Sequence, residues 1–245
     1  MIVTIHQPEY LPWLGFFDKA CQSEIFVLLD NVQFRKNYFQ NRNRIKTPQG
    51  EKLLTVPVRR GRGSSKTILE VEIDNSKDWR RKHWTTIANH YRSAPYFPDY
   101  EADFQTIYER SWYMLLDLNI VLILLLAKHL GVATRFIRSS ELGISGKGSE
   151  LNLRLCKAVG ATTYLSGRWG RVYIDEPAFK RADIKIVYQE FQHPIYPQLF
   201  EGFLPALGGI DLLFNCGPES RRILDKARVA PAQASEKAPN FWENQ

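Results

Sequence analysis

Two short polar stretches near the start of the chain carry the side chains best suited to chemistry. His6 follows the β-branched run Ile2–Ile5, and Asp30 follows the apolar run Ile25–Leu29. A histidine at a strand end can act as a general base or bind phosphate, because its pKa lies near neutral. Asp30 can bind a ribose hydroxyl, a magnesium ion or a substrate amine. Each residue also has a structural alternative, a hydrogen bond within its own turn.

Amide and cationic side chains alternate in the sequence NRNRIK, residues 41–46, which we call the comb. In a strand, Arg42 and Arg44 share one face and Asn41 and Asn43 the other. Two arginines on one face suit bidentate binding of phosphate or carboxylate. A solvated hairpin face is the alternative. Further candidate substrate-binding residues from the same part of the chain are Gln7, Tyr10, Trp13, Gln33 and Lys46.

Later segments add weaker candidates. Ser166 and Gly167 open the glycine-punctuated run SGRWGR, whose backbone amides could cradle an anion. His193 could close over the site. The basic loop Arg59–Lys66 resembles a segment that grips phosphate or touches RNA, although such loops are often merely exposed. His83 shares one helix face with a second histidine, and the neighbouring tryptophans favour aromatic packing over metal binding.

The elements that must position these residues alternate between strand and helix. Helical and strand periodicity predicts parallel strands joined by right-handed helical crossovers. In such a sheet, ligands bind beyond the carboxyl ends of the strands, near a topological switch. The predicted strands are 2–5, 25–29, 134–137, 162–165 and 184–188, and the predicted helices are 13–20, 77–92, 99–112, 113–130 and 148–159.

Residues 38–74 interrupt this alternation. Tyr38–Ile45 and Lys52–Val58 flank a Pro-Gln-Gly turn, which predicts a hairpin, and Thr67–Ile73 is expected to add a strand. We therefore expect one α/β domain over residues 1–229, with a Rossmann-like, mostly parallel sheet flanked by helices. It carries a β-rich insertion at 38–74 and a helical segment at 76–130, and a flexible tail is expected at 230–245.

Composition narrows the class of protein. The chain has 245 residues, a formal charge of +7 and three widely spaced cysteines. No cysteine pair has metal-ligand or disulfide spacing, so we expect neither a zinc site nor any other metal centre of that kind. There is no signal-peptide pattern, and no apolar run is long enough to span a bilayer, so a cytoplasmic location is expected. The positive charge favours an anionic partner such as a nucleotide, a sugar nucleotide, RNA or a lipid surface, or else serves solubility. We expect no DNA binding.

Seven motifs in order carry a family resemblance: HQPEYLPWLGFFDK, FVLLDNVQF, QNRNRIK, LLTVPV, KHW, YLSG and IDLLFN. From Met1 to about Gly217 the chain resembles the WbqC-like family. Proteins of this family are encoded in bacterial O-antigen and other surface-polysaccharide clusters. The resemblance implies a glycine (aminoacyl) transferase role in O-antigen synthesis.

The beginning of the chain is also distantly similar to pantothenate synthetase and other nucleotidyl transferases with a HIGH motif. In those enzymes a carboxylate is adenylated before an amine attacks it. This chain lacks the two histidines of that motif and has Trp13 and Phe16 at the nearest positions. His6 would have to replace them from the preceding strand end.

Two functional hypotheses follow. In the first, an enzyme attaches an acyl or aminoacyl group to an amino sugar on a nucleotide, and His6 is the base while Asp30 positions the amine. The arginine pair binds phosphates, and the donor is an adenylate made from ATP and magnesium, an aminoacyl-tRNA or a coenzyme A thioester. In the second, the protein binds an anionic nucleotide or RNA in the same pathway without catalysis.

Overall fold

The computed structural model describes residues 1–59 and 66–227. Within that part of the chain, five strands form one sheet in the order β5-β2-β1-β6-β7. Every neighbouring pair in it is parallel, which confirms the predicted mostly parallel α/β fold. The strands are β1 (Ile2–His6), β2 (Ile25–Leu28), β5 (Arg135–Arg138), β6 (Thr163–Ser166) and β7 (Lys185–Tyr188).

Helices cover both faces of this sheet, which explains the nearly continuous apolar character of its central strands. Val3, Ile5 and Val27 belong to the smaller core, which α5 and α6 complete. Phe26 and Leu28 belong to the larger core on the opposite face, with residues of α1 and α4. The bounds of these helices are Leu14–Cys21 for α1, Leu115–His129 for α4, Gly148–Ala158 for α5 and Glu176–Arg181 for α6.

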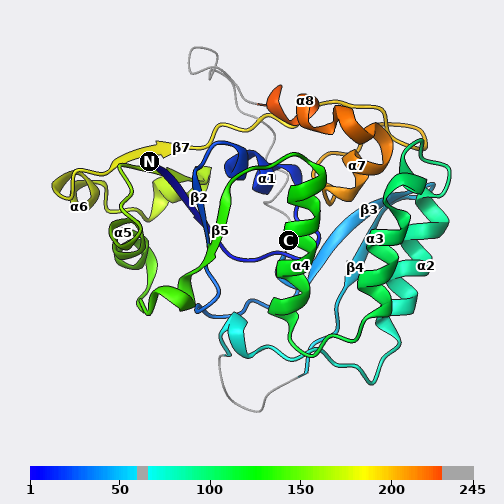
Figure 1. Cartoon of the computed structure of the whole chain (residues 1–245), viewed down its shortest axis with the longest axis horizontal. Helices are drawn as coiled ribbons and strands as arrows, with labels where there is room; N and C mark the ends of the chain where they lie inside the picture. Colours follow the sequence, from blue (N-terminus) through cyan, green and yellow to red (C-terminus); the bar gives the residue numbers. More distant parts are fainter. Residues whose placement is uncertain (60–65, 228–245) are drawn as a thin grey trace.

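A second part of the molecule lies beside the sheet and contains the antiparallel hairpin β3–β4 (Figure 1). Helix α2 contacts both β3 and α3, and α3 contacts α4 and α7. The larger core runs without a break from the sheet into this part. The bounds are Arg42–Thr47 for β3, Gly50–Thr55 for β4, Trp79–Tyr91 for α2, Phe97–Glu109 for α3, Ile210–Cys216 for α7 and Ser220–Asp225 for α8.

Two details of the predicted β-rich insertion are wrong. Strand β3 begins at Arg42 rather than at Tyr38, because the Tyr38 carbonyl accepts hydrogen bonds from the amides of Asn41 and Arg42 and closes a turn there. The expected strand over residues 67–73 is a 3-10 helix, Ile68–Glu70. Its capping box, formed between Thr67 and Glu70, favours a helical turn over a strand.

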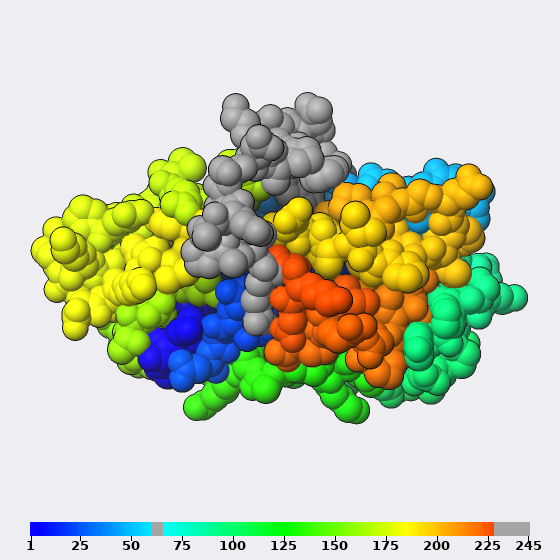
Figure 2. All heavy atoms as spheres, turned by 90° about the horizontal axis from the view of Figure 1, so that it is seen from above, coloured from blue at the N-terminus to red at the C-terminus, as the bar shows by residue number. Residues whose placement is uncertain are grey.

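A long connection after β7 was not predicted to have a structural role, and neither were the short helices α6, α7 and α8. Figure 2, seen from above, shows this connection (gold) crossing the molecule to lie beside the hairpin (blue). The buried Lys46 ammonium of β3 holds it there by donating hydrogen bonds to the carbonyls of Phe200 and Gly202. The Gly208 amide donates to the Arg44 carbonyl at 2.9 Å.

Among the residues that the structure describes, no helix has both the length and the apolar character needed to cross a bilayer. The apolar stretch predicted to be a core helix is α4, and its inner face is buried. The basic loop Arg59–Lys66 lies mostly outside the described residues, and the predicted tail at 230–245 lies wholly outside them.

Candidate functional site

The sheet has its topological switch between β1 and β6. From β1 the chain passes through α1 to β2 on one side, and from β6 it passes through α6 to β7 on the other. His6 ends β1 and Ser166 ends β6, so the loops after these residues border the crevice between the diverging strands. Ligands of open parallel sheets bind at such a crevice.

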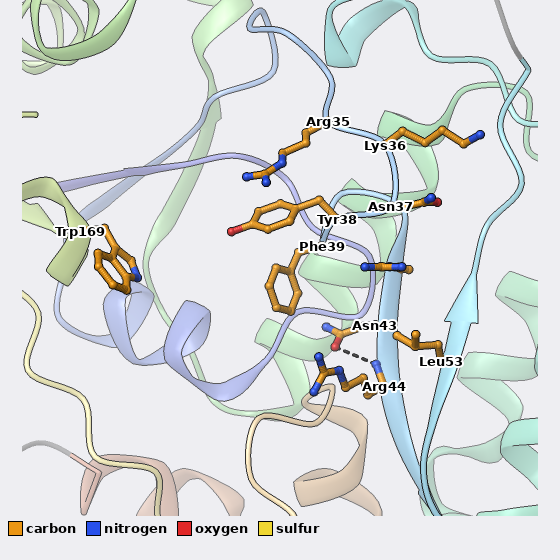
Figure 3. A pocket seen from close by; sticks show the side chains of 10 residues that line it. Arg35, Lys36, Asn37, Tyr38, Phe39, Asn43, Arg44, Leu53 and Trp169 are labelled. Atoms are coloured by element: carbon orange, nitrogen blue, oxygen red, sulfur yellow. Dashed lines mark hydrogen bonds between the residues drawn. The ribbon is translucent and has the colours of Figure 1, made fainter. Parts of the chain in front are cut away.

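A cavity of about 370 Å³ opens beside this crevice (Figure 3). We call it the arginine pocket. Trp169, from the 3-10 helix that follows β6, forms one wall. The facing wall comes from the loop after β2 and from the hairpin, and Figure 3 shows Tyr38, Phe39 and Arg44 on that side. Its lining residues are Arg35, Lys36, Asn37, Tyr38, Phe39, Arg42, Asn43, Arg44, Leu53 and Trp169.

The arginine pocket is positively charged and partly aromatic. Four of the residues listed above are Arg or Lys, and no Asp or Glu lines the cavity in the described part of the chain. Arg44 forms an ion pair of 2.9 Å with Glu51, which anchors it on the neighbouring strand. The Arg35 guanidinium lies 4.5 Å from the centre of the Tyr38 ring. Cations beside exposed rings suit a ligand that has both phosphates and a planar base.

The predicted alternation along the comb is confirmed by burial. Arg42 and Arg44 are half-buried and line the cavity, whereas Asn41 and Asn43 are buried. The Asn43 amide donates to the carbonyls of Tyr10 and Leu11, at 3.3 and 2.6 Å. Its side-chain oxygen accepts from the Arg44 backbone amide, the dashed line in Figure 3. The asparagines therefore fix the loops around the pocket, and the arginines face the space where a ligand would lie.

His6 belongs to a cluster of ionisable groups at the end of β1. Its Nε2 lies 3.2 Å from Oε1 of Glu9, whose side chain is 5% exposed. Lys19 of α1 is also buried, and its Nζ donates to the Ile5 carbonyl at 3.5 Å. Burial lowers the pKa of His6 below 6.5, and the charge of Lys19 lowers it further, while Glu9 raises it. Burial lowers the pKa of Lys19 to about 8.

Two atoms of this cluster are buried without a hydrogen-bond partner in the described structure, His6 Nδ1 and Glu9 Oε2. Unsatisfied buried polar atoms are rare in native proteins, and a catalytic role is one of the explanations for them. His6 does not line the arginine pocket, but its strand β1 pairs with β6, which leads to Trp169. The cluster and the pocket therefore arise from adjacent strand ends.

Asp30 is buried and fully occupied. Its carboxylate accepts from Ser139 Oγ, from the Ser140 amide and hydroxyl, and from Arg138 Nε, at 2.7 to 2.9 Å. Burial would raise the pKa of Asp30, but these hydrogen bonds, Arg138 first, lower it. Its side chain thus joins the ends of β2 and β5. The Leu29 amide donates to the His6 carbonyl, so the two strand ends meet through their backbones.

Other predicted site residues lie in several environments. Gln7 Oε1 accepts from Gln40 Nε2 at 2.6 Å, and Gln40 Oε1 accepts from the Arg35 amide. Gln33 is exposed and pairs with Thr67 in a single β-bridge.

Tyr10 is fully buried, and its hydroxyl bonds to His83 Nδ1 at 2.8 Å and to Tyr108 at 2.6 Å. His83 packs edge-on against Trp79, which confirms the expected aromatic packing.

Trp13 lies against the first turn of α1, and His193 is linked to Trp13 through the ring of Phe191. A side chain at Gly15 would meet the Trp13 indole at 2.2 Å, so this ring covers the beginning of the helix. Phe191 packs edge-on against Trp13, and His193 packs edge-on against Phe191.

Of the two residues predicted to cradle an anion, Gly167 is half-buried and is the N-cap of the 3-10 helix Arg168–Val172. Ser166 is buried, and its hydroxyl donates to the Gly167 carbonyl at 3.2 Å.

Sequence reasoning missed several residues that the geometry brings to the site, among them two in the pocket and two beside His6. Arg35 and Tyr38 line the pocket from a loop without periodicity, and Glu9 and Lys19 are buried charges among apolar neighbours. Glu9 stands three residues after His6, a spacing that could have indicated the pair. Lys19 interrupts an apolar helix face, which was a second available signal. Trp169 was noticed only as part of a glycine-rich run.

Fold and site together define an α/β protein with a cationic, aromatic pocket beside its topological switch. Residues 7–223 match the model of the WbqC-like protein family. The chain belongs to this family. It is 36% identical over 221 residues to "Uncharacterized protein Rv1507c" of Mycobacterium tuberculosis, covering 89% of this chain and 95% of that protein. No solved structure matches the chain.

Proposed function

We propose that this WbqC-like protein takes part in surface-polysaccharide (O-antigen) biosynthesis and transfers a glycyl or other acyl group to the amine of a nucleotide-linked amino sugar. The observation that carries the proposal is the arginine pocket beside the topological switch. Its paired Arg42 and Arg44 suit a diphosphate, and Trp169 offers a face on which a base can stack. A nucleotide-linked sugar has both groups.

The chemistry asked of the protein is amide formation. The amine nitrogen attacks the acyl carbon, a C–N bond forms, and the bond from that carbon to the donor's oxygen or sulfur breaks. A proton leaves the nitrogen and ends on the departing oxygen or sulfur. His6 is the proposed carrier of this proton, because its lowered pKa leaves it neutral at pH 7.

Glu9 orients the proposed base. With Nε2–H of His6 facing the Glu9 carboxylate, the lone pair sits on Nδ1. Nδ1 is buried without a partner, so in this proposal the groups that cover it move when the substrate binds, while Nε2–H stays on Glu9. Asp30, whose oxygens are occupied, serves in it as the tie that holds the strand ends together rather than as the group that binds the amine.

Three classes of acyl donor fit the proposed reaction. Free glycine with ATP and magnesium, an aminoacyl-tRNA and a coenzyme A thioester all deliver an activated acyl carbon. We further propose a cytoplasmic location, which the three free cysteines support, since free thiols are typical of a reducing compartment.

Transfer assays test the proposal. Purified protein is incubated with a panel of UDP- and dTDP-linked amino sugars and each donor in turn, and the N-acylated product is sought by mass spectrometry. We expect product with one donor class, and a loss of about 100-fold or more in His6→Gln. Arg42→Ala should raise KM for the sugar nucleotide, whereas the exposed Arg92→Ala should not. Full activity in His6→Gln would refute the role of His6. An unchanged KM for the sugar nucleotide in Arg42→Ala would refute the role of the pocket.

One observation favours a second candidate, a binding protein without catalysis. The residues that line the arginine pocket include no His, Cys, Asp or Glu in the described part of the chain, so the cavity itself lacks the histidine and carboxylates that most often act as acid or base. Sugar-nucleotide binding that weakens steeply with salt, together with no turnover of any donor, would establish this candidate over the enzyme.

A further inference from the structure

A second, larger cavity of about 820 Å³ shares a wall with the arginine pocket. We call it the lysine pocket. Lys36 and Asn37 line both cavities. Figure 3 shows their side chains pointing away from those of Arg35 and Tyr38. Its lining residues are Lys36, Asn37, Asn41, Thr55, Val56, Pro57, Val58, Arg59, Asp74, Lys77, Trp79, Lys82 and His83.

Cations dominate the rim of the lysine pocket. Lys36, Lys77 and Lys82 are exposed, and none of them forms an ion pair with a described carboxylate. Arg59 pairs with Glu72 at 3.4 Å but stays 58% exposed. Asp74 is the one carboxylate among the described lining residues, and it accepts from the hydroxyl and the amide of Ser76. The described lining therefore carries an excess of positive charge, which Asp74 and Glu72 offset only in part.

The wall between the pockets is held in an uncommon conformation. Asn37 has φ of 58°, in the left-handed region that non-glycine residues rarely adopt. Its backbone amide donates to Asn41 Oδ1 at 3.0 Å, and the Asn41 amide donates to the Val56 carbonyl. Backbone strain of this kind collects at ligand-binding sites, where surrounding contacts enforce it. Here those contacts come from the hairpin and hold Lys36 at the junction of the cavities.

From this geometry we propose that the lysine pocket is a second binding site for a small phosphate-bearing molecule, and that Lys36 contributes to both sites. Its size falls in the range of small-molecule sites, roughly 300–1,000 Å³. Trp79 and His83, both buried, form part of its lining. A bounded cavity with flexible lysines favours a diphosphate over a long polyanion. If this ligand is the carrier of the acyl donor, that assignment rests on the proposed function. The existence of the site does not rest on it.

Inorganic pyrophosphate is the probe for the test. Isothermal titration calorimetry on the full chain at low salt should resolve two sites in the wild type. Arg42→Ala should lose one, and the pair Lys77→Ala/Lys82→Ala should weaken the other about tenfold, taking about threefold to fivefold per surface charge. Lys36→Ala should weaken both. Lys157→Ala, an exposed lysine on α5 outside both cavities, is the matched control.

The outcomes separate the alternatives. A single site that only Arg42→Ala removes would overturn the proposal. A second result would also overturn it: a single-stranded RNA oligomer binds once and competes with pyrophosphate at both sites, and every pocket variant weakens this RNA binding. That result would indicate one continuous groove rather than two sites. All of the replaced lysines are exposed, so unchanged circular dichroism is expected. Intact binding of a sugar nucleotide in Lys77→Ala/Lys82→Ala would leave the proposed function standing even if the second site failed.

Discussion

Protonation of His83 should set part of the acid limit of this protein's stability. His83 is 7% exposed, and burial lowers its pKa from 6.5 to about 4, opposed by a hydrogen bond to the Thr55 backbone. The hydroxyl of Tyr10 bonds to its Nδ1 at 2.8 Å. With the other ring nitrogen donating to Thr55, Nδ1 is the acceptor. A proton added to Nδ1 would point at the Tyr10 hydroxyl, which already donates its own hydrogen to Nδ1.

The sign and size of this pH effect on the free energy of unfolding follow from proton linkage. Between pH 4 and 6.5 the unfolded chain binds the proton and the folded chain does not, so the free energy of unfolding falls as pH drops through this window. A pKa fall from 6.5 to about 4 corresponds to about 3 kcal/mol at 1.36 kcal/mol per pKa unit. The contribution is fully present above pH 6.5 and is lost by about pH 4.

Urea unfolding followed by circular dichroism at pH 7.5, 5.5 and 4.5 measures this effect. His83→Gln keeps an acceptor for Tyr10 and removes the titrating group, so its unfolding free energy should fall less than that of the wild type by up to about 3 kcal/mol. His90→Gln, on the same helix but less buried, should behave nearly as the wild type. Equal pH slopes for wild type and His83→Gln, within about 0.5 kcal/mol, would refute the reasoning.

Three further expectations concern the site. Lys19→Met should raise the pKa of His6 and Glu9→Gln should lower it, both measured by NMR titration; shifts of the same sign would contradict the cluster's electrostatics. Asp30→Ala should destabilise the fold by about 3–5 kcal/mol in urea unfolding, because it leaves a partly buried arginine unpaired, and a loss below 1 kcal/mol would mean that the tie is dispensable. Trp169→Ala should weaken nucleotide binding by about 1–3 kcal/mol in calorimetry, while binding of pyrophosphate stays unchanged; equal losses for both ligands would argue against stacking.

The parallel sheet was predictable because each central strand is a short apolar run followed by polar residues. The strand-end rule then indicated the edge of the sheet beside which the arginine pocket lies. The two-residue alternation along the comb also predicted which side chains of β3 face together. These are local properties, which the order of residue types determines directly.

Partners distant in sequence were not predictable. Nothing near Asp30 indicates that Ser139 and Ser140 will occupy its oxygens, because they lie in the 3-10 helix after β5, more than a hundred residues away. Lys46 was predicted to bind substrate, yet its ammonium holds the connection after β7. Trp169 reaches the pocket only because β6 lies next to β1. A residue's type indicates what it can bind, and its neighbours in the fold decide whether it is available.

The central claim is that the arginine pocket receives a nucleotide-linked sugar. A crystal structure of the protein with a bound UDP- or dTDP-linked amino sugar tests it most directly. The account predicts diphosphate oxygens within hydrogen-bond distance of Arg42 and Arg44, with the base against Trp169 and the sugar directed toward the strand ends of β1 and β6. Density for the nucleotide anywhere else on the molecule, with the arginine pocket filled only by solvent, would contradict it.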